Sequence, residues 1–297
     1  MDVIAQVVVL FLLMFCGFLS SRAHLISDEG IAGINKLVIY FTLPCLTIAK
    51  LQQSVDPALV HDLVWVFVLG GASMLLFGAL GRFVFFRNET PARRAAFTAV
   101  CLFSNAGYMG YPVLTAAFGA DNLIYCVIYV AIFNVLSWSV GVMLYDRSAL
   151  DIRKMLKVPS LVTAVLGIVL FALEIRLPGV LFNALDSMGS VTTPLAMFII
   201  GTRLTQLHLS DLKDVKLMGV CALRLLVLPV LVWLILTVLG FSGLVRAVIT
   251  LCSAMPSAAV NVIQAENYRG DSVLASRCVA VSTLLSIATI PIILLLV

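Results

Sequence analysis

Charged side chains are scarce in this sequence. Lysine, arginine, aspartate and glutamate make up only 11% of the 297 residues, whereas 62% are hydrophobic. A soluble domain carries about 25% charged residues, and a globule of this length cannot hide so much apolar surface from water. The same composition excludes a disordered chain. It therefore predicts a protein whose solvent is the lipid bilayer.

Residues that usually carry chemistry are also few. The three histidines lie in loops or at the edges of apolar runs, and no HExxH, GxGD, aspartate-rich or Walker A motif is present. The seven cysteines lie inside apolar runs without a Cys-x-x-Cys pair, which predicts buried thiols and no metal site. These absences argue against an intramembrane enzyme and against a bound cofactor. The net charge of +4 gives no sign of a nucleic-acid partner.

Long apolar runs dominate what is present. A transmembrane helix needs about 20 apolar residues, and continuous runs of that length disfavour the alternating pattern of an outer-membrane barrel. The ten expected spans are residues 3–20, 31–51, 63–86, 92–118, 123–145, 158–173, 180–204, 215–239, 244–265 and 272–297. The sequence therefore predicts an all-α polytopic membrane protein with no soluble domain.

Basic residues divide unevenly between the two sides of these spans. Fourteen of the 19 lie in or beside the odd-numbered loops, whereas only Lys50, Arg176 and Arg246 lie in the even-numbered ones. Because cytoplasmic loops are enriched in lysine and arginine, the odd loops are expected inside. The cytoplasmic (inner) membrane is the expected location, and both termini are expected outside.

The chain also divides into two halves of five spans, residues 1–150 and 151–297. Pro44 and Pro194 lie in the second span of each half, and Pro112 and Pro256 lie in the fourth. Because five is an odd number, the second half must enter the membrane with the opposite orientation. This pattern predicts two inverted five-helix repeats, as in many secondary transporters.

The fourth and ninth spans contain residues that break helices. Residues 104–112 read Ser-Asn-Ala-Gly-Tyr-Met-Gly-Tyr-Pro, and residues 253–261 hold the counterpart around Pro256. Glycine costs a helix about 1 kcal/mol and proline about 3 kcal/mol. Broken backbone in a membrane is tolerated only where protein or a cavity surrounds it. We therefore expect both spans to unwind and to cross near the membrane centre.

Such a crossing would direct half-helix N-termini into one cavity, which suits an anion. Asn105 and Asn261 could add amide donors, and Ser104, Tyr108 and Ser257 could add hydroxyls. The alternative is that these side chains only hold helices together. That structural role is favoured for Asn261 taken alone, and substrate binding is favoured for Asn105.

Three basic residues lie within the expected spans. Lys36 and Arg277 lie near span ends, where a long side chain can reach the interface. Arg224 lies about 13 Å deep at 1.5 Å per residue, so a partner or a wet cavity is expected for it. No acidic residue lies clearly at mid-span, which argues against a proton relay through Asp or Glu at the centre. Sodium could be bound by carbonyls and hydroxyls, and the sequence does not decide between the two coupling ions.

Four motifs, in the second, fourth, seventh and ninth spans, together resemble those of a known transporter family. Asn105–Pro112 is similar to the fourth-helix motif of the auxin efflux carriers, which include the plant PIN-FORMED carriers and many bacterial proteins, within the bile acid/sodium symporter-like superfamily. Residues 35–44 resemble the second helix of that family and residues 193–201 the seventh. Residues 255–260, followed by Tyr268 and Asp271, resemble the ninth helix and the loop after it.

The resemblance implies ten helices in two inverted repeats, scaffold and transport domains drawn from both repeats, and an organic anion as substrate. The substrate-binding residues expected from position and motif are Asn105, Gly107, Tyr108, Gly110, Pro112, Pro256, Ser257, Asn261 and Lys36. Plant carriers have a long central loop, whereas only twelve residues separate the two halves here. Compact bacterial members are the nearer comparison, and some of these are assigned to malonate, malate or similar carboxylates.

The function expected from the sequence is therefore secondary transport of a small organic anion, a mono- or dicarboxylate, by alternating access. An anion channel or uncoupled facilitator is the closest alternative, but charged rings and carbonyl filters suit symmetric oligomers better than inverted repeats. Whether the chain forms a homodimer is left open.

Overall fold

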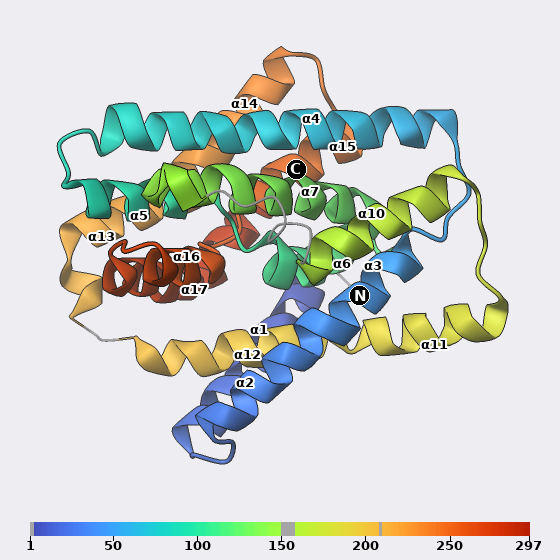
Figure 1. The fold of residues 1–297 in the computed structure, drawn as a ribbon, viewed down its shortest axis with the longest axis horizontal. Coiled ribbons are helices and arrows are strands. Elements are labelled where there is room, and N and C mark those ends of the chain that lie inside the picture. The colour runs from blue at the N-terminus through green and yellow to red at the C-terminus, as the bar shows by residue number, and fades with distance from the viewer. Residues whose placement is uncertain (1–2, 150–157, 208–209) are drawn as a thin grey trace.

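The computed structural model describes residues 3–149, 158–207 and 210–297. Within these residues every regular element is a helix (Figure 1). Most of the expected loop at 146–157, and the expected boundary between residues 150 and 151, lie outside the described residues.

Several helices of the first half contain π-helical turns or full breaks. Its elements are α1 (Val3–Arg22), α2 (Asp28–Leu37), η1 (Val38–Thr42), α3 (Leu43–Lys50), α4 (Pro57–Ala79), η2 (Leu80–Phe85), α5 (Pro91–Leu102), η3 (Ala106–Gly110), α6 (Tyr111–Phe118), η4 (Ala120–Asn122), α7 (Leu123–Leu136), η5 (Ser137–Gly141), α8 (Val142–Tyr145) and η6 (Arg147–Ala149).

The second half has a similar succession of elements. They are α10 (Pro159–Ala172), α11 (Gly179–Ser190), α12 (Thr192–Arg203), η7 (Leu204–Gln206), η8 (Asp211–Lys213), α13 (Val215–Ala222), η9 (Leu223–Val227), α14 (Leu228–Val238), α15 (Gly243–Ser253), α16 (Val260–Asn267) and α17 (Ser272–Leu294).

Seven helical stretches in the described residues are long and apolar enough to cross a membrane. They are Ala5–Arg22, Asp28–Lys50, Pro57–Phe85, Ala120–Tyr145, Gly179–Arg203, Val215–Val238 and Ser272–Leu294. The other three expected spans are represented by shorter helices, because 92–118 and 244–265 are interrupted and α10 has 14 residues. The chain is therefore a polytopic, all-helical membrane protein.

Polar side chains at the breaks between apolar runs fix where helices begin. Ser27 caps α2 by accepting a hydrogen bond from the backbone N–H of Gly30, and Asp56 caps α4 in the same way from Ala58. Asp214 and Asp271 cap α13 and α17. Each cap satisfies backbone N–H groups that the first turn of a helix leaves without partners.

Helix packing centres on α7, which is the most buried of the long spans (Figure 1). The long helix α4 packs on α5, α7 and α15, while α1 packs along α12 and α3 packs on α10 and α11. Gly17 and Gly201 let the α1 and α12 backbones approach closely, because a Cβ at either position would collide with the partner backbone.

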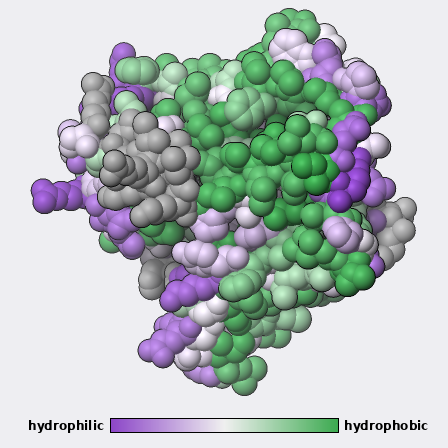
Figure 2. All heavy atoms as spheres, turned by 45° about the vertical axis from the view of Figure 1, so that its right-hand side comes forward, coloured by the Kyte–Doolittle hydropathy of each residue, from purple (hydrophilic) through white to green (hydrophobic). Residues whose placement is uncertain are grey.

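The outer surface is apolar where lipid is expected. Val8, Leu12, Phe15 and Leu19 form one exposed stripe along α1, at the three- and four-residue spacing of a helix face. Figure 2 shows a broad hydrophobic area with polar residues gathered at its margins. This arrangement is the one expected of helices that cross a bilayer and end in water.

Candidate functional site

Two interrupted helices meet at the centre of the candidate site. The chain between α5 and η3, residues 103–105, lies antiparallel to the chain between α15 and α16, residues 254–259, and Ser104 pairs with Ser257. The N–H of Asn105 donates to the carbonyl of Pro256 at 2.7 Å, and the N–H of Ala258 donates to the carbonyl of Phe103 at 3.1 Å. Each break therefore satisfies backbone groups of the other, as buried polar backbone requires.

Asn105 begins the helix that follows the first break. Its Oδ1 accepts from the N–H of Tyr108 at 3.3 Å, and its backbone carbonyl accepts from Met109 and Gly110. The side chain is half-buried, and no acceptor among the described residues takes a hydrogen bond from its Nδ2. The amide donor of Asn105 therefore remains available to a ligand.

The neighbours of Asn105 divide into an open side and a packed side. A Cβ added at Gly107 would meet no atom within 4 Å, so space lies next to this residue. The Tyr108 hydroxyl donates to Oδ1 of Asn35 at 2.7 Å and joins η3 to α2. Gly110 and Pro112 are buried, and a Cβ at Gly110 would touch Ala106 and Cys126 at 3.5 Å. The open side thus holds Asn105, Gly107 and Tyr108.

Asn261 occupies a different environment in the second break. It is fully buried, and its Nδ2 donates to the carbonyl of Phe103 at 3.3 Å and to Oγ of Ser257 at 2.8 Å. The N–H of Ser257 donates in turn to Oγ of Ser282 on α17 at 3.1 Å. Here the amide and hydroxyl groups hold one break against the other.

Lys36 lies outside this group of residues. Its side chain is exposed on α2, directly after Asn35. The structure therefore brings together the expected residues of the two breaks and leaves Lys36 at the surface of a neighbouring helix.

Three polar residues at the site were not among those expected from sequence. Asn35 accepts from Tyr108, and Ser282 accepts from Ser257. Gln264 is buried and its Nε2 donates to the carbonyl and Oγ of Ser137, at 2.7 and 3.0 Å. The position of Gln264 three residues after Asn261 is a sequence signal, because residues at that spacing share a helix face. Ser282 gives no such signal.

The other basic residues within the spans have partners. Arg277 contacts Asp211 at 2.7 Å and Asp214 at 3.0 Å. The buried Arg224 donates from Nη1 to the carbonyl of Ser253 at 2.6 Å. The partner expected for Arg224 is therefore a backbone carbonyl at the end of α15.

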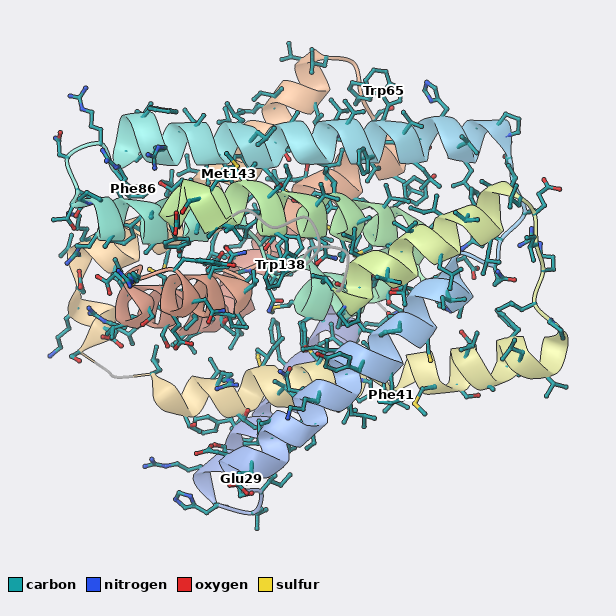
Figure 3. The ribbon with its side chains drawn as sticks, in the orientation of Figure 1. Glu29, Phe41, Trp65, Phe86, Trp138 and Met143 are labelled. Carbon is teal, nitrogen blue, oxygen red and sulfur yellow. The ribbon has the colours of Figure 1, made fainter. Side chains whose placement is uncertain are left out.

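A polar cavity of about 230 Å³ lies between the start of α2 and the end of α12. It is lined by Ser21, Asp28, Ile31, Thr202, Arg203 and Thr205. Glu29, labelled in Figure 3, follows Asp28 at this end of α2. Asp28 and Arg203 give the cavity side chains of both signs of charge.

Comparison with known proteins places the chain among membrane transport proteins. The family model described as Membrane transport protein matches residues 2–294. An uncharacterized transporter of Methanothermobacter thermautotrophicus is 27% identical over 98% of this chain and 96% of its own length. A Rhizobium meliloti protein named "Putative malonate transporter" is 24% identical over 97% of this chain and 94% of its own length. The uncharacterized transporter YfdV of Escherichia coli is 21% identical over 97% of this chain and 95% of its own length.

The resemblance noted in the sequence is thereby confirmed, since the family model covers nearly the whole chain. The motifs of the second, fourth, seventh and ninth spans all lie within the matched residues. The chain belongs to the membrane transport family of the auxin efflux carriers and is a transport protein, not an enzyme.

Proposed function

We propose that this protein is a secondary transporter that carries a small organic anion across the cytoplasmic membrane by alternating access. The observation that carries the proposal is the meeting of the two breaks beside the side-chain amide of Asn105, whose Nδ2 has no acceptor among the described residues. Open space at Gly107 gives a ligand room next to that donor. The substrate is held at this crossing of the fourth and ninth spans.

The proposed architecture is ten spans in two inverted five-helix repeats. Its support is the recurrence of the same irregularities, because η2 and η9 lie in the third span of each half and the full breaks lie in the fourth. We assign to the scaffold domain the helices α1, α2 with η1, α3, α10, α11 and α12, which pack on one another and come from both halves. The remaining helices correspond to the transport domain.

The proposed orientation has both termini outside and the segment 146–157 inside, from the distribution of basic residues. A single engineered cysteine in that segment, on a cysteine-free background, should resist an impermeant thiol reagent applied to intact cells. Labelling of this cysteine from outside would contradict the proposed orientation and indicate the opposite one.

The proposed substrate class is a mono- or dicarboxylate. Half-helix N-termini and an amide donor suit a carboxylate because both present N–H groups to negative charge. The name of the relative from Rhizobium meliloti supports the same class. Tyr108 completes the proposed site, and Lys36 attracts the anion toward it from the surface of α2.

Flux into sealed proteoliposomes tests the proposal. Purified protein should take up radiolabelled malonate or malate with saturable kinetics, and internal unlabelled carboxylate should accelerate uptake by exchange. Empty liposomes and Asn105→Ala protein are the controls, and imposed sodium or proton gradients would identify the coupling ion. Conductance that does not saturate would indicate a channel and contradict the carrier mechanism. Transport restricted to cations or sugars would contradict the proposed substrate class.

A further inference from the structure

A buried arginine lies directly behind the two breaks. Arg224 belongs to η9, and only 1% of its surface is exposed. Among the described residues no aspartate or glutamate forms an ion pair with it, and its Nε has no hydrogen-bond partner. An isolated buried charge is costly, so its surroundings must supply negative potential from another source.

The surroundings of Arg224 contain the carbonyl end of α15 and a part of α5. Its Nη1 donates at 2.6 Å to the carbonyl of Ser253, the last residue of α15. The guanidinium lies 6.0 Å from the ring centre of Phe77 on α4. The turn that holds it packs against α5, which ends at Leu102, directly before the first break.

The C-terminal end of a helix carries about half a negative charge and the N-terminal end about half a positive charge. Two converging C-terminal ends together therefore offer about one negative charge, which matches one guanidinium. With those ends compensated, the crossing presents the N-terminal ends of η3 and α16 and the amide of Asn105. The local potential then favours an anion.

We propose that Arg224 is a specificity-determining residue, whose fixed charge neutralises the carbonyl ends of α5 and α15 so that the crossing accepts a carboxylate and repels a cation. This inference rests on the proposed function for its ligand, although the charge effect itself can be measured without a substrate. Arg224 does not touch the ligand. It acts through the potential at the breaks.

The first test separates charge from packing. Binding of malonate is measured on purified wild-type protein and on Arg224→Lys, Arg224→Gln and the exposed control Arg176→Gln, with thermal unfolding of each. Glutamine keeps a neutral N–H donor on a shorter side chain but lacks the charge. A unit charge that acts over a distance on the order of 10 Å at an intermediate dielectric constant changes affinity about tenfold, and a loss of this size is expected in Arg224→Gln. It should change less than about threefold in Arg224→Lys and in the control.

The second test needs no substrate. A thiol introduced as Gly107→Cys, with the seven native cysteines replaced, is alkylated by uncharged iodoacetamide at pH 7. A nearby positive charge favours the reactive thiolate, so adding Arg224→Gln should slow alkylation by about three- to tenfold, and adding Arg176→Gln should not.

The outcomes distinguish the two proposals. Slower alkylation with no carboxylate binding by the wild type would sustain the charge role and overturn the proposed substrate. Unchanged alkylation in folded Arg224→Gln protein would overturn the charge role, whether or not malonate affinity falls, because a loss of affinity alone would then reflect packing.

Discussion

The two interrupted helices contain similar residues and use them differently. In the first break Asn105 is half-buried and keeps its amide donor, whereas in the second break Asn261 is fully buried and spends both amide hydrogens on Phe103 and Ser257. The first break borders open space at Gly107, and the second is fastened to α17 through Ser282. The first break therefore has an amide donor available to a ligand. The second break uses the amide of Asn261 to hold the two breaks together.

The largest expected effect falls on the first break. Replacing Asn105 with alanine should remove a hydrogen bond to a charged ligand, worth about 1.5–3 kcal/mol. At about 1.4 kcal/mol per factor of ten, affinity for malonate should fall roughly ten- to a hundredfold. Loss of the hydrogen bond from the N–H of Tyr108 to Oδ1 of Asn105 should also lower the free energy of unfolding by about 1 kcal/mol. The exposed Asn183 on α11 provides the matched control, Asn183→Ala. Full affinity in folded Asn105→Ala protein would assign the ligand to backbone groups instead.

The reverse pattern is expected at the second break. Asn261→Ala should lower the free energy of unfolding by about 1–2 kcal/mol, because Oγ of Ser257 loses a buried partner. The affinity of the protein that remains folded should change little. Thermal unfolding and binding on the same preparation, with the exposed Asn267→Ala as control, measure both. A large loss of affinity without loss of stability would erase the distinction between the breaks.

A smaller effect is expected at Lys36, which shows how far the binding side extends. Because its side chain is exposed on α2, its charge should steer an anion toward the site more than bind it. Lys36→Gln should lower the rate of uptake at low salt by about two- to threefold, and the difference should vanish at high salt. A salt-independent tenfold loss would place Lys36 in the binding site itself.

The smallest effect concerns acid stability near α17, the helix that fastens the second break. Hydrogen bonds from the backbone N–H of Leu217, together with Arg277, lower the pKa of Asp214. Because the folded-state pKa is depressed, the stabilisation is present above the unfolded value of about 3.9 and is lost as pH falls through the folded value. Wild-type protein should therefore melt at a higher temperature than Asp214→Asn at neutral pH. The difference should begin to shrink below about pH 4 and vanish below the folded-state pKa of Asp214.

Convergence of the two melting temperatures would locate the stabilisation in the ionised carboxylate. A constant difference at all pH values would assign the effect to the shape of the loop.

Local sequence features predicted the positions of the helix breaks but not how each break would be used. The glycines and proline after Asn105, and Pro256 in the counterpart, announced irregular backbone in otherwise apolar runs. Asn105 and Asn261 looked alike, because a lone asparagine in a membrane helix reads equally well as a donor to a ligand or to a neighbouring helix. The partners that separate them lie 158 residues apart in the chain, as in the bond from Asn261 to Phe103.

Arg224 makes the same point for charge. Its depth predicted a partner, yet the partner is a backbone carbonyl, and a search for acidic side chains could not have found it. Asn35 directly precedes Lys36, which was expected at the site from sequence. Only the structure shows that Asn35 accepts a hydrogen bond from the hydroxyl of Tyr108.

The sequence alone determined that this chain is an all-helical membrane protein with two interrupted spans, and it indicated the family to which the chain belongs. Hydropathy, helix breakers and ordered motifs are local properties of the chain and can be read without the structure. The tertiary structure alone decided which amide remains available, which is consumed, and where a buried charge finds its compensation. Those outcomes depend on hydrogen bonds between segments distant in sequence, and in an environment without water each such group takes whichever partner the packing brings within reach.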